Sequence, residues 1–135
     1  MTYSFGHVIQ AVVSSIGSLA AEKKLLLTVD VAPDLPPLSA AAEVAVYRIA
    51  QEALTNVVRH AHARACQVRV SADDDAVTLE VIDDGRGPSG VPGSAGVGLA
   101  SMRERAAEMG GEWRVEPGAD GGTRVVARLP RAGGA

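Results

Sequence analysis

The segment 84–96 most constrains the fold of this chain, because it holds five glycines and two prolines and so excludes a regular helix or strand. Alternating apolar residues directly before it predict a strand over residues 76–82. Helical spacing after it predicts a helix from about residue 97 to 109, where Gly110 begins a glycine pair that ends it. A long irregular connection therefore joins a strand to a helix in the second half of the chain.

Helix and strand patterns alternate over the rest of the chain. Helical spacing predicts a first helix to about residue 23, and Ser39 is a suitable N-cap for a long helix to about residue 61. The other expected strands are residues 25–31, 66–72, 112–116 and 123–129. This order predicts an α+β fold, a two-layer α/β sandwich whose mixed, mostly antiparallel sheet of about five strands carries about three helices on one face.

Composition narrows the class of protein. A chain of 135 residues suffices for one domain, with an ordered core over about residues 5–130. The net charge of −3 is too mild to indicate a surface for nucleic acid or membrane. The single cysteine, Cys66, excludes an internal disulfide and fits a reducing compartment, and no apolar run approaches the roughly 18 residues of a membrane span. We therefore expect a cytoplasmic domain that contacts neither nucleic acid nor membrane directly.

A stripe of polar side chains marks the long helix. Glu52, Asn56 and Arg59 are four and seven residues apart, which places them on one face of an α-helix, with His60 beside it. Such stripes are usually solvated, but the apolar residues around much of this helix indicate that the stripe faces a cleft. The asparagine oxygen can bind Mg²⁺, Arg59 and His60 can reach phosphate oxygens, and Glu52 can orient a water or act as a general base.

Asp83 ends the strand that precedes the glycine-rich segment. A carboxylate at a strand end can accept a hydrogen bond from an exocyclic amine such as that of adenine, and Gly85 and Gly87 would let the base lie against bare backbone. An ordinary Asp-Gly turn is the plainer interpretation of this block taken alone.

A second glycine-rich block, Gly96 to Leu99 with Gly98 inside it, opens the next helix. Free N–H groups at such a helix start suit a triphosphate, although a plain helix cap has the same sequence. Residues 88–95 would then form a lid over the phosphates. The three blocks together indicate a site for a magnesium–nucleotide complex.

Two competing motifs fail on local geometry. Residues 85–90 match the spacing G-x-G-x-x-G, but Pro88 and Pro92 prevent the helix that a dinucleotide site needs within its glycines. His60, His62 and Cys66 suggest a metal site, yet histidines two residues apart point away from each other on a helix. We therefore expect neither a dinucleotide fold nor a histidine–cysteine metal centre.

The three blocks, in this order, resemble the catalytic, ATP-binding domain of bacterial sensor histidine kinases, within the GHKL superfamily that also includes gyrase, heat-shock chaperones and mismatch-repair ATPases. Residues 52–61 look like its N box, 83–87 like its first glycine box and 96–99 like its second. Residues 47–56 and 98–106 resemble, more narrowly, the subgroup whose partner regulators carry output domains of the nitrate-response type. The resemblance covers about residues 5–130 and implies the GHKL ATPase fold.

The resemblance also implies roles for single residues and the cofactors ATP and Mg²⁺. Asn56 would bind the magnesium ion, Asp83 would accept a hydrogen bond from the adenine amine, and Thr123 would support the adenine site. The glycines expected against the nucleotide are Gly87, Gly96 and Gly98.

The histidines depart from the pattern of full kinases of this subgroup, whose phosphoacceptor lies in a Glu-Leu-His-Asp-like motif on a helical dimerisation hairpin. His7 lacks the acidic neighbour, and the other two histidines belong to the nucleotide helix. We therefore expect a catalytic domain that does not phosphorylate itself and donates the γ-phosphate of ATP to a histidine on a separate dimerisation domain. A downstream response regulator is the further expected partner.

Other interpretations stay open from the sequence. The chain could be an excised catalytic domain, including one from the cytoplasmic part of a membrane-anchored sensor, or a stand-alone relative. A GHKL-fold conformational ATPase, an anti-sigma serine kinase and a non-catalytic nucleotide-binding module remain alternatives. Gyrase-like ATPases usually need a dimerising arm and a transducer domain, and no segment here fits either.

Overall fold

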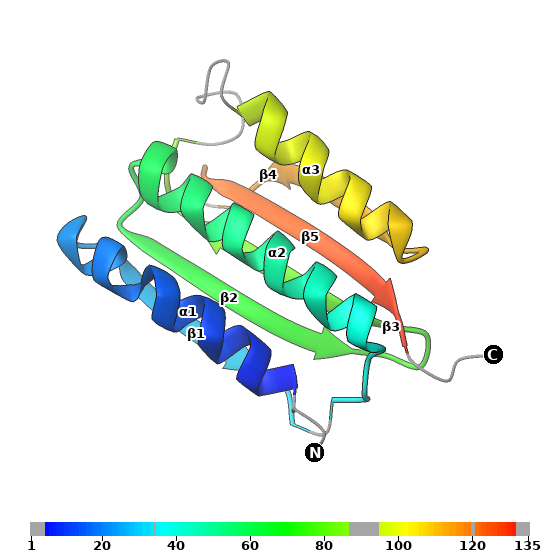
Figure 1. Cartoon of the computed structure of the whole chain (residues 1–135). Coiled ribbons are helices and arrows are strands. Elements are labelled where there is room, and N and C mark those ends of the chain that lie inside the picture. Colours follow the sequence, from blue (N-terminus) through cyan, green and yellow to red (C-terminus); the bar gives the residue numbers. More distant parts are fainter. Residues whose placement is uncertain (1–4, 34, 87–94, 120, 132–135) are drawn as a thin grey trace.

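Helices cover one face of a five-stranded sheet in the computed structural model, which describes residues 5–33, 35–86, 95–119 and 121–131 (Figure 1). The helices are α1 (Phe5–Glu22), α2 (Ala40–Asn56) and α3 (Ala95–Glu108), and α2 continues into the π-helical segment η1 (Val57–Ala61). The strands are β1 (Leu26–Val31), β2 (Ala65–Ala72), β3 (Ala76–Asp83), β4 (Glu112–Pro117) and β5 (Thr123–Pro130).

The sheet has the strand order β1-β2-β3-β5-β4, with β1 parallel to β2 and the other neighbours antiparallel. The parallel pair arises because α2 crosses over between β1 and β2. A tight turn instead joins β2 to β3, where the Asp73 carboxylate accepts hydrogen bonds from the N–H groups of Asp75 (2.8 Å) and Ala76 (2.9 Å). The predicted two-layer sandwich with a mixed, mostly antiparallel sheet is confirmed.

The core lies between the sheet and the helices. Helix α2 begins at the predicted N-cap, where Ser39 Oγ accepts a hydrogen bond from Ala42 N (3.1 Å), and it packs between α1 and α3. Its buried face is rich in alanine, which lets the helix approach its neighbours closely. The three central strands, β2, β3 and β5, contribute alternate residues to this core, among them Val68, Val70, Val77, Leu79, Val81, Ala127 and Leu129.

The opposite face of the sheet carries ion pairs in place of helices. Arg124 bonds the Glu80 carboxylate at 2.6 Å and also pairs with Glu116 on β4. Val126, which lies opposite Glu80 in the β3–β5 ladder, is buried among these long side chains.

One helix boundary and one helix type differ from the sequence expectation. Helix α3 begins at Ala95, so the irregular connection ends two residues earlier than predicted; glycine is tolerated in a first turn, whose N–H groups have no helical partner. The long helix continues to Ala61 as expected, but its last five residues form the π-helix η1. Within the described residues, no helix combines the length and hydropathy needed to cross a membrane.

Candidate functional site

The predicted site residues gather at one end of the sandwich. Figure 1 shows that α2 and η1 end, β3 ends, and α3 and β5 begin at this same end. The arrangement follows from the antiparallel order of β3 and β5 and from the irregular connection that leads from β3 to α3. The three sequence blocks, which are far apart along the chain, therefore lie at the same end of the sandwich.

Asp83 is the last residue of β3 and has a relative exposure of 6%. Its Oδ1 atom accepts a hydrogen bond from the N–H group of Gly85 at 2.8 Å. Burial raises the pKa of the Asp83 carboxyl, against the hydrogen bonds from the N–H groups of Gly85 and Thr123, which lower it. Since no basic side chain of the described residues forms an ion pair with Asp83, its carboxylate is a strong acceptor held at the edge of the core.

Gly122 holds the start of β5 against the end of β3. A Cβ atom at this position would lie 1.8 Å from the backbone oxygen of Asp83 and 2.8 Å from the Cα atom of Asp84, so no other residue fits without a backbone shift. The close contact brings Thr123 next to the Asp83 carboxyl. Asp83, Gly85 and Thr123 therefore form one compact group.

The polar stripe lies where α2 changes into η1. Glu52 and Asn56 are half-buried, and Asn56 is the last residue of α2. A π-helical turn holds more residues than an α-helical one, so Arg59 is rotated from the position that the α-helical spacing from Asn56 gives. The side chain of His60 lies outside the described part of the chain.

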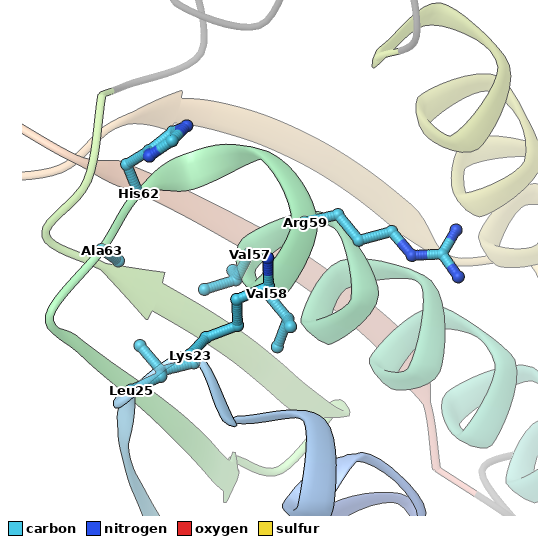
Figure 2. Close-up of a pocket in the computed structure, with 7 residues that line it drawn as sticks. All are labelled: Lys23, Leu25, Val57, Val58, Arg59, His62 and Ala63. Carbon is cyan, nitrogen blue, oxygen red and sulfur yellow. The ribbon is translucent and has the colours of Figure 1, made fainter. Parts of the chain in front are cut away.

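A cavity of about 110 Å³ lies on the α1 side of η1. Its lining residues are Lys23, Leu25, Val57, Val58, Arg59, His62 and Ala63. Figure 2 shows the Arg59 guanidinium pointing away from Lys23 and His62, so the basic groups do not converge on this space. Ligand pockets usually enclose about 300–1,000 Å³, and this cavity is too small for a nucleotide.

The second glycine block lies in the first turns of α3, where the backbone of Gly96, Gly98 and Leu99 is helical. Gly87 and most of the predicted lid, residues 88–94, lie outside the described residues. Placing glycines at the beginning of a helix fits the predicted phosphate-binding role, because nearby N–H groups have no helical acceptor.

The residues present fit a nucleotide with its metal ion. The buried Asp83 carboxylate, which forms no ion pair with a side chain of the described residues, suits a donor such as an amine, and the amide of Asn56 offers a neutral oxygen for Mg²⁺. No group of three His, Cys, Asp or Glu side chains that could hold a metal occurs among the described residues. A magnesium ion would therefore depend on Asn56 together with phosphate oxygens.

Three residues beside the site had no predicted role there. Asp84 bonds the segment that follows η1, Gly122 sets the contact of β5 with β3, and Cys66 lies opposite Asp83 in the β2–β3 ladder. Burial, followed by the charges of the two aspartates, raises the pKa of the Cys66 thiol to about 12. The paired glycines before Thr123 were the signal for Gly122, but no sequence pattern shows which backbone they contact.

Comparison with known proteins identifies the family of this chain. The model of the family described as histidine kinase-, DNA gyrase B- and HSP90-like ATPase matches residues 41–133. Over 100 residues the chain is 39% identical to the sensor histidine kinase LnrJ of Bacillus subtilis (strain 168), a match that covers 74% of this chain and 24% of LnrJ. The chain is 34% identical over 125 residues to the signal transduction histidine-protein kinase/phosphatase UhpB of Salmonella typhimurium, covering 90% of this chain and 24% of UhpB.

Solved structures show the same fold. The catalytic domain of histidine kinase ThkA aligns with a TM-score of 0.82 at 14% identity, covering 96% of this chain and 94% of that one. Full-length ShkA in complex with AMPPNP aligns with a TM-score of 0.84 at 24% identity, covering 98% of this chain and 31% of that one. The chain spans about a quarter of the length of LnrJ and UhpB. It belongs to the family of histidine kinase-, DNA gyrase B- and HSP90-like ATPases and is an ATP-binding domain of the kind that sensor histidine kinases carry.

Proposed function

We propose that this domain binds Mg-ATP at the end of the sandwich where β3 ends and α3 begins, and donates the γ-phosphate to a histidine on a separate dimerisation domain. The observation that supports this most is the buried Asp83 carboxylate, which has bare backbone beside it at Gly85 and Gly122. A buried carboxylate that pairs with no basic side chain in the described part of the chain suits the amine of adenine.

The other residues take the roles that the sequence predicts for them. Asn56 would hold Mg²⁺, which when bound neutralises charge on the phosphates. Arg59 and His60 would contact phosphate oxygens, and Glu52 would orient a water or act as a general base. Gly96 and Gly98 would leave the start of α3 open to the phosphates. Phosphoryl transfer depends mainly on such placement and charge neutralisation.

The partners extend the proposal beyond this chain. The named relatives are sensor kinases, so the phosphoacceptor would lie on a dimerisation domain of the same full-length protein or of another chain, with a response regulator downstream. A regulator of the nitrate-response type is the narrower proposal, which rests on residues 47–56 and 98–106.

Replacing Asn56 with alanine tests the metal site. We expect the affinity for Mg-AMPPNP to fall by more than tenfold, because the variant lacks the amide oxygen that binds Mg²⁺. Titration calorimetry with magnesium and with EDTA gives the measurement, and the two proteins should bind alike in EDTA. Gln10→Ala, which removes an exposed amide from α1, is the control. Equal affinity of Asn56→Ala and wild type in magnesium would remove Asn56 from the site.

Labelling with γ-³²P-ATP tests the transfer. The isolated chain should acquire no acid-labile phosphate, whereas an added dimerisation domain of a related kinase should become labelled on its histidine. Phosphohistidine on His7, His60 or His62 of this chain would contradict the proposed division of roles. Release of inorganic phosphate without labelling of any added domain would favour a conformational ATPase instead.

A further inference from the structure

Asp84 connects two segments that the proposed function needs in a fixed relation. Its Oδ1 atom accepts hydrogen bonds from the N–H groups of Arg64 (2.8 Å) and Ala65 (3.0 Å), and its own N–H group donates to the carbonyl oxygen of Ala65 (3.3 Å). These bonds extend the β2–β3 ladder beyond its last pair, Cys66 and Asp83. Asp84, the residue directly after Asp83, therefore holds the start of β2 through these hydrogen bonds.

The segment that Asp84 holds is the exit from η1. The chain leaves η1 through His62, whose φ of 52° is left-handed, and reaches β2 only three residues later. The carbonyl oxygen of Arg64 accepts a hydrogen bond from Leu26 N (2.9 Å), which joins β1 to the same point. The position of η1 is thus fixed at one end by α2 and at the other by the short segment 62–64 that leads to β2.

The hydrogen bonds that the Asp84 carboxylate accepts favour its ionised form. Its hydrogen bond from Ala65, followed by that from Arg64, holds the pKa of the Asp84 carboxyl below its ordinary value, and the side chain is exposed. An asparagine at this position keeps an oxygen that can accept both N–H groups, whereas an alanine leaves both without this acceptor. The two substitutions therefore separate the hydrogen bonds from the charge.

We propose that Asp84 is a positioning residue, which sets the distance between the phosphate and metal end of the site on α2 and η1 and the base end at Asp83. It does so without touching the nucleotide, through Arg64 and Ala65. The inference rests on the proposed Mg-ATP site and adds to it the residue that keeps its two ends in register.

The test compares Asp84→Ala, Asp84→Asn and a charge control, Asp74→Ala. Asp74 is an exposed aspartate in the turn at the other end of the β2–β3 hairpin. Affinity for Mg-AMPPNP, amide hydrogen exchange and thermal unfolding are measured on each. We expect Asp84→Ala to bind about three- to tenfold more weakly, with exchange at Arg64 and Ala65 at least tenfold faster. Asp84→Asn should stay within about twofold of wild type in both, and Asp74→Ala should match wild type.

The outcomes distinguish this inference from the proposed function. If wild type binds Mg-AMPPNP and Asp84→Ala binds it equally well, Asp84 does not position the site, even if its melting temperature falls. A loss in Asp84→Asn as large as that in Asp84→Ala would also overturn the inference, because the charge and not the hydrogen bonds would then matter. If wild type binds no nucleotide, the proposed function itself is wrong, whatever the exchange rates at Arg64 and Ala65.

Discussion

Replacing Gly122 with alanine is expected to lower the free energy of unfolding by at least about 1–3 kcal/mol, the range for overpacking in a close-packed region. The added Cβ atom would lie 1.8 Å from the backbone oxygen of Asp83, and the three atoms nearest to it all belong to the backbone of Asp83 and Asp84, so no flexible side chain can move aside. The contact between β3 and β5 must therefore open. Because this displaces both Asp83 and Thr123, nucleotide affinity should be lost together with stability.

Urea unfolding measures the first effect and calorimetric titration the second. Gly17→Ala is the matched control, because a Cβ atom at this helical position meets nothing within 4 Å. That change should stabilise the domain by about 0.5–1 kcal/mol, since glycine is unfavourable inside a helix. A Gly122→Ala protein as stable as wild type would show that β5 does not approach β3 as closely as described.

Asp83→Ala is expected to weaken ATP binding by roughly ten- to a hundredfold. A hydrogen bond to a charged group contributes about 1.5–3 kcal/mol, and about 1.4 kcal/mol corresponds to a factor of ten in affinity. GTP presents a carbonyl oxygen where ATP has its amine, so wild type should reject GTP. Asp83→Asn can turn its amide to donate a hydrogen bond, so this variant should lose ATP affinity and narrow the gap between ATP and GTP.

The protonation of Asp83 gives this prediction a second readout. Burial raises the pKa of its carboxyl, and the neutral acid is the poorer acceptor. As the pH falls toward this raised pKa, ATP affinity of wild type should therefore decrease more than that of Asp83→Ala, which serves as the control for protonation of ATP itself. Equal binding of ATP and GTP by wild type would mean that Asp83 does not read the base.

The fold could be predicted largely because its signals are local. Strand alternation, the Ser39 cap and the glycines after α3 depend on residues close in sequence, and the structure places each element within two residues of its expected bounds. The π-helical end of α2 could not be predicted, because α-helical spacing was assumed throughout the stripe. This assumption also gave Arg59 the wrong rotation relative to Asn56.

The sequence blocks that form the candidate site could be recognised, but the contacts between their residues could not be predicted. The grouping of Asp83, Gly85 and Thr123 could be expected from a resemblance between sequences, and the roles of these residues stay predictions. Asp84 and Gly122 act through pairs that are 19 and about 39 residues apart, and no periodicity joins such distant positions. Long-range backbone contacts of this kind become visible only when the strands are paired.

Because Cys66 is buried, the reactivity of its thiol can report local opening of the domain. Cys66 is 2% exposed and faces the helices directly beside Asp83, and burial raises the pKa of its thiol to about 12, so the thiolate fraction at neutral pH is far smaller than that of an exposed cysteine. Only the thiolate reacts with alkylating reagents, so the closed state is chemically silent. A thiol reagent therefore modifies this chain only when the packing between the sheet and the helices opens at Cys66, and the rate of modification reports how often this end of the core opens.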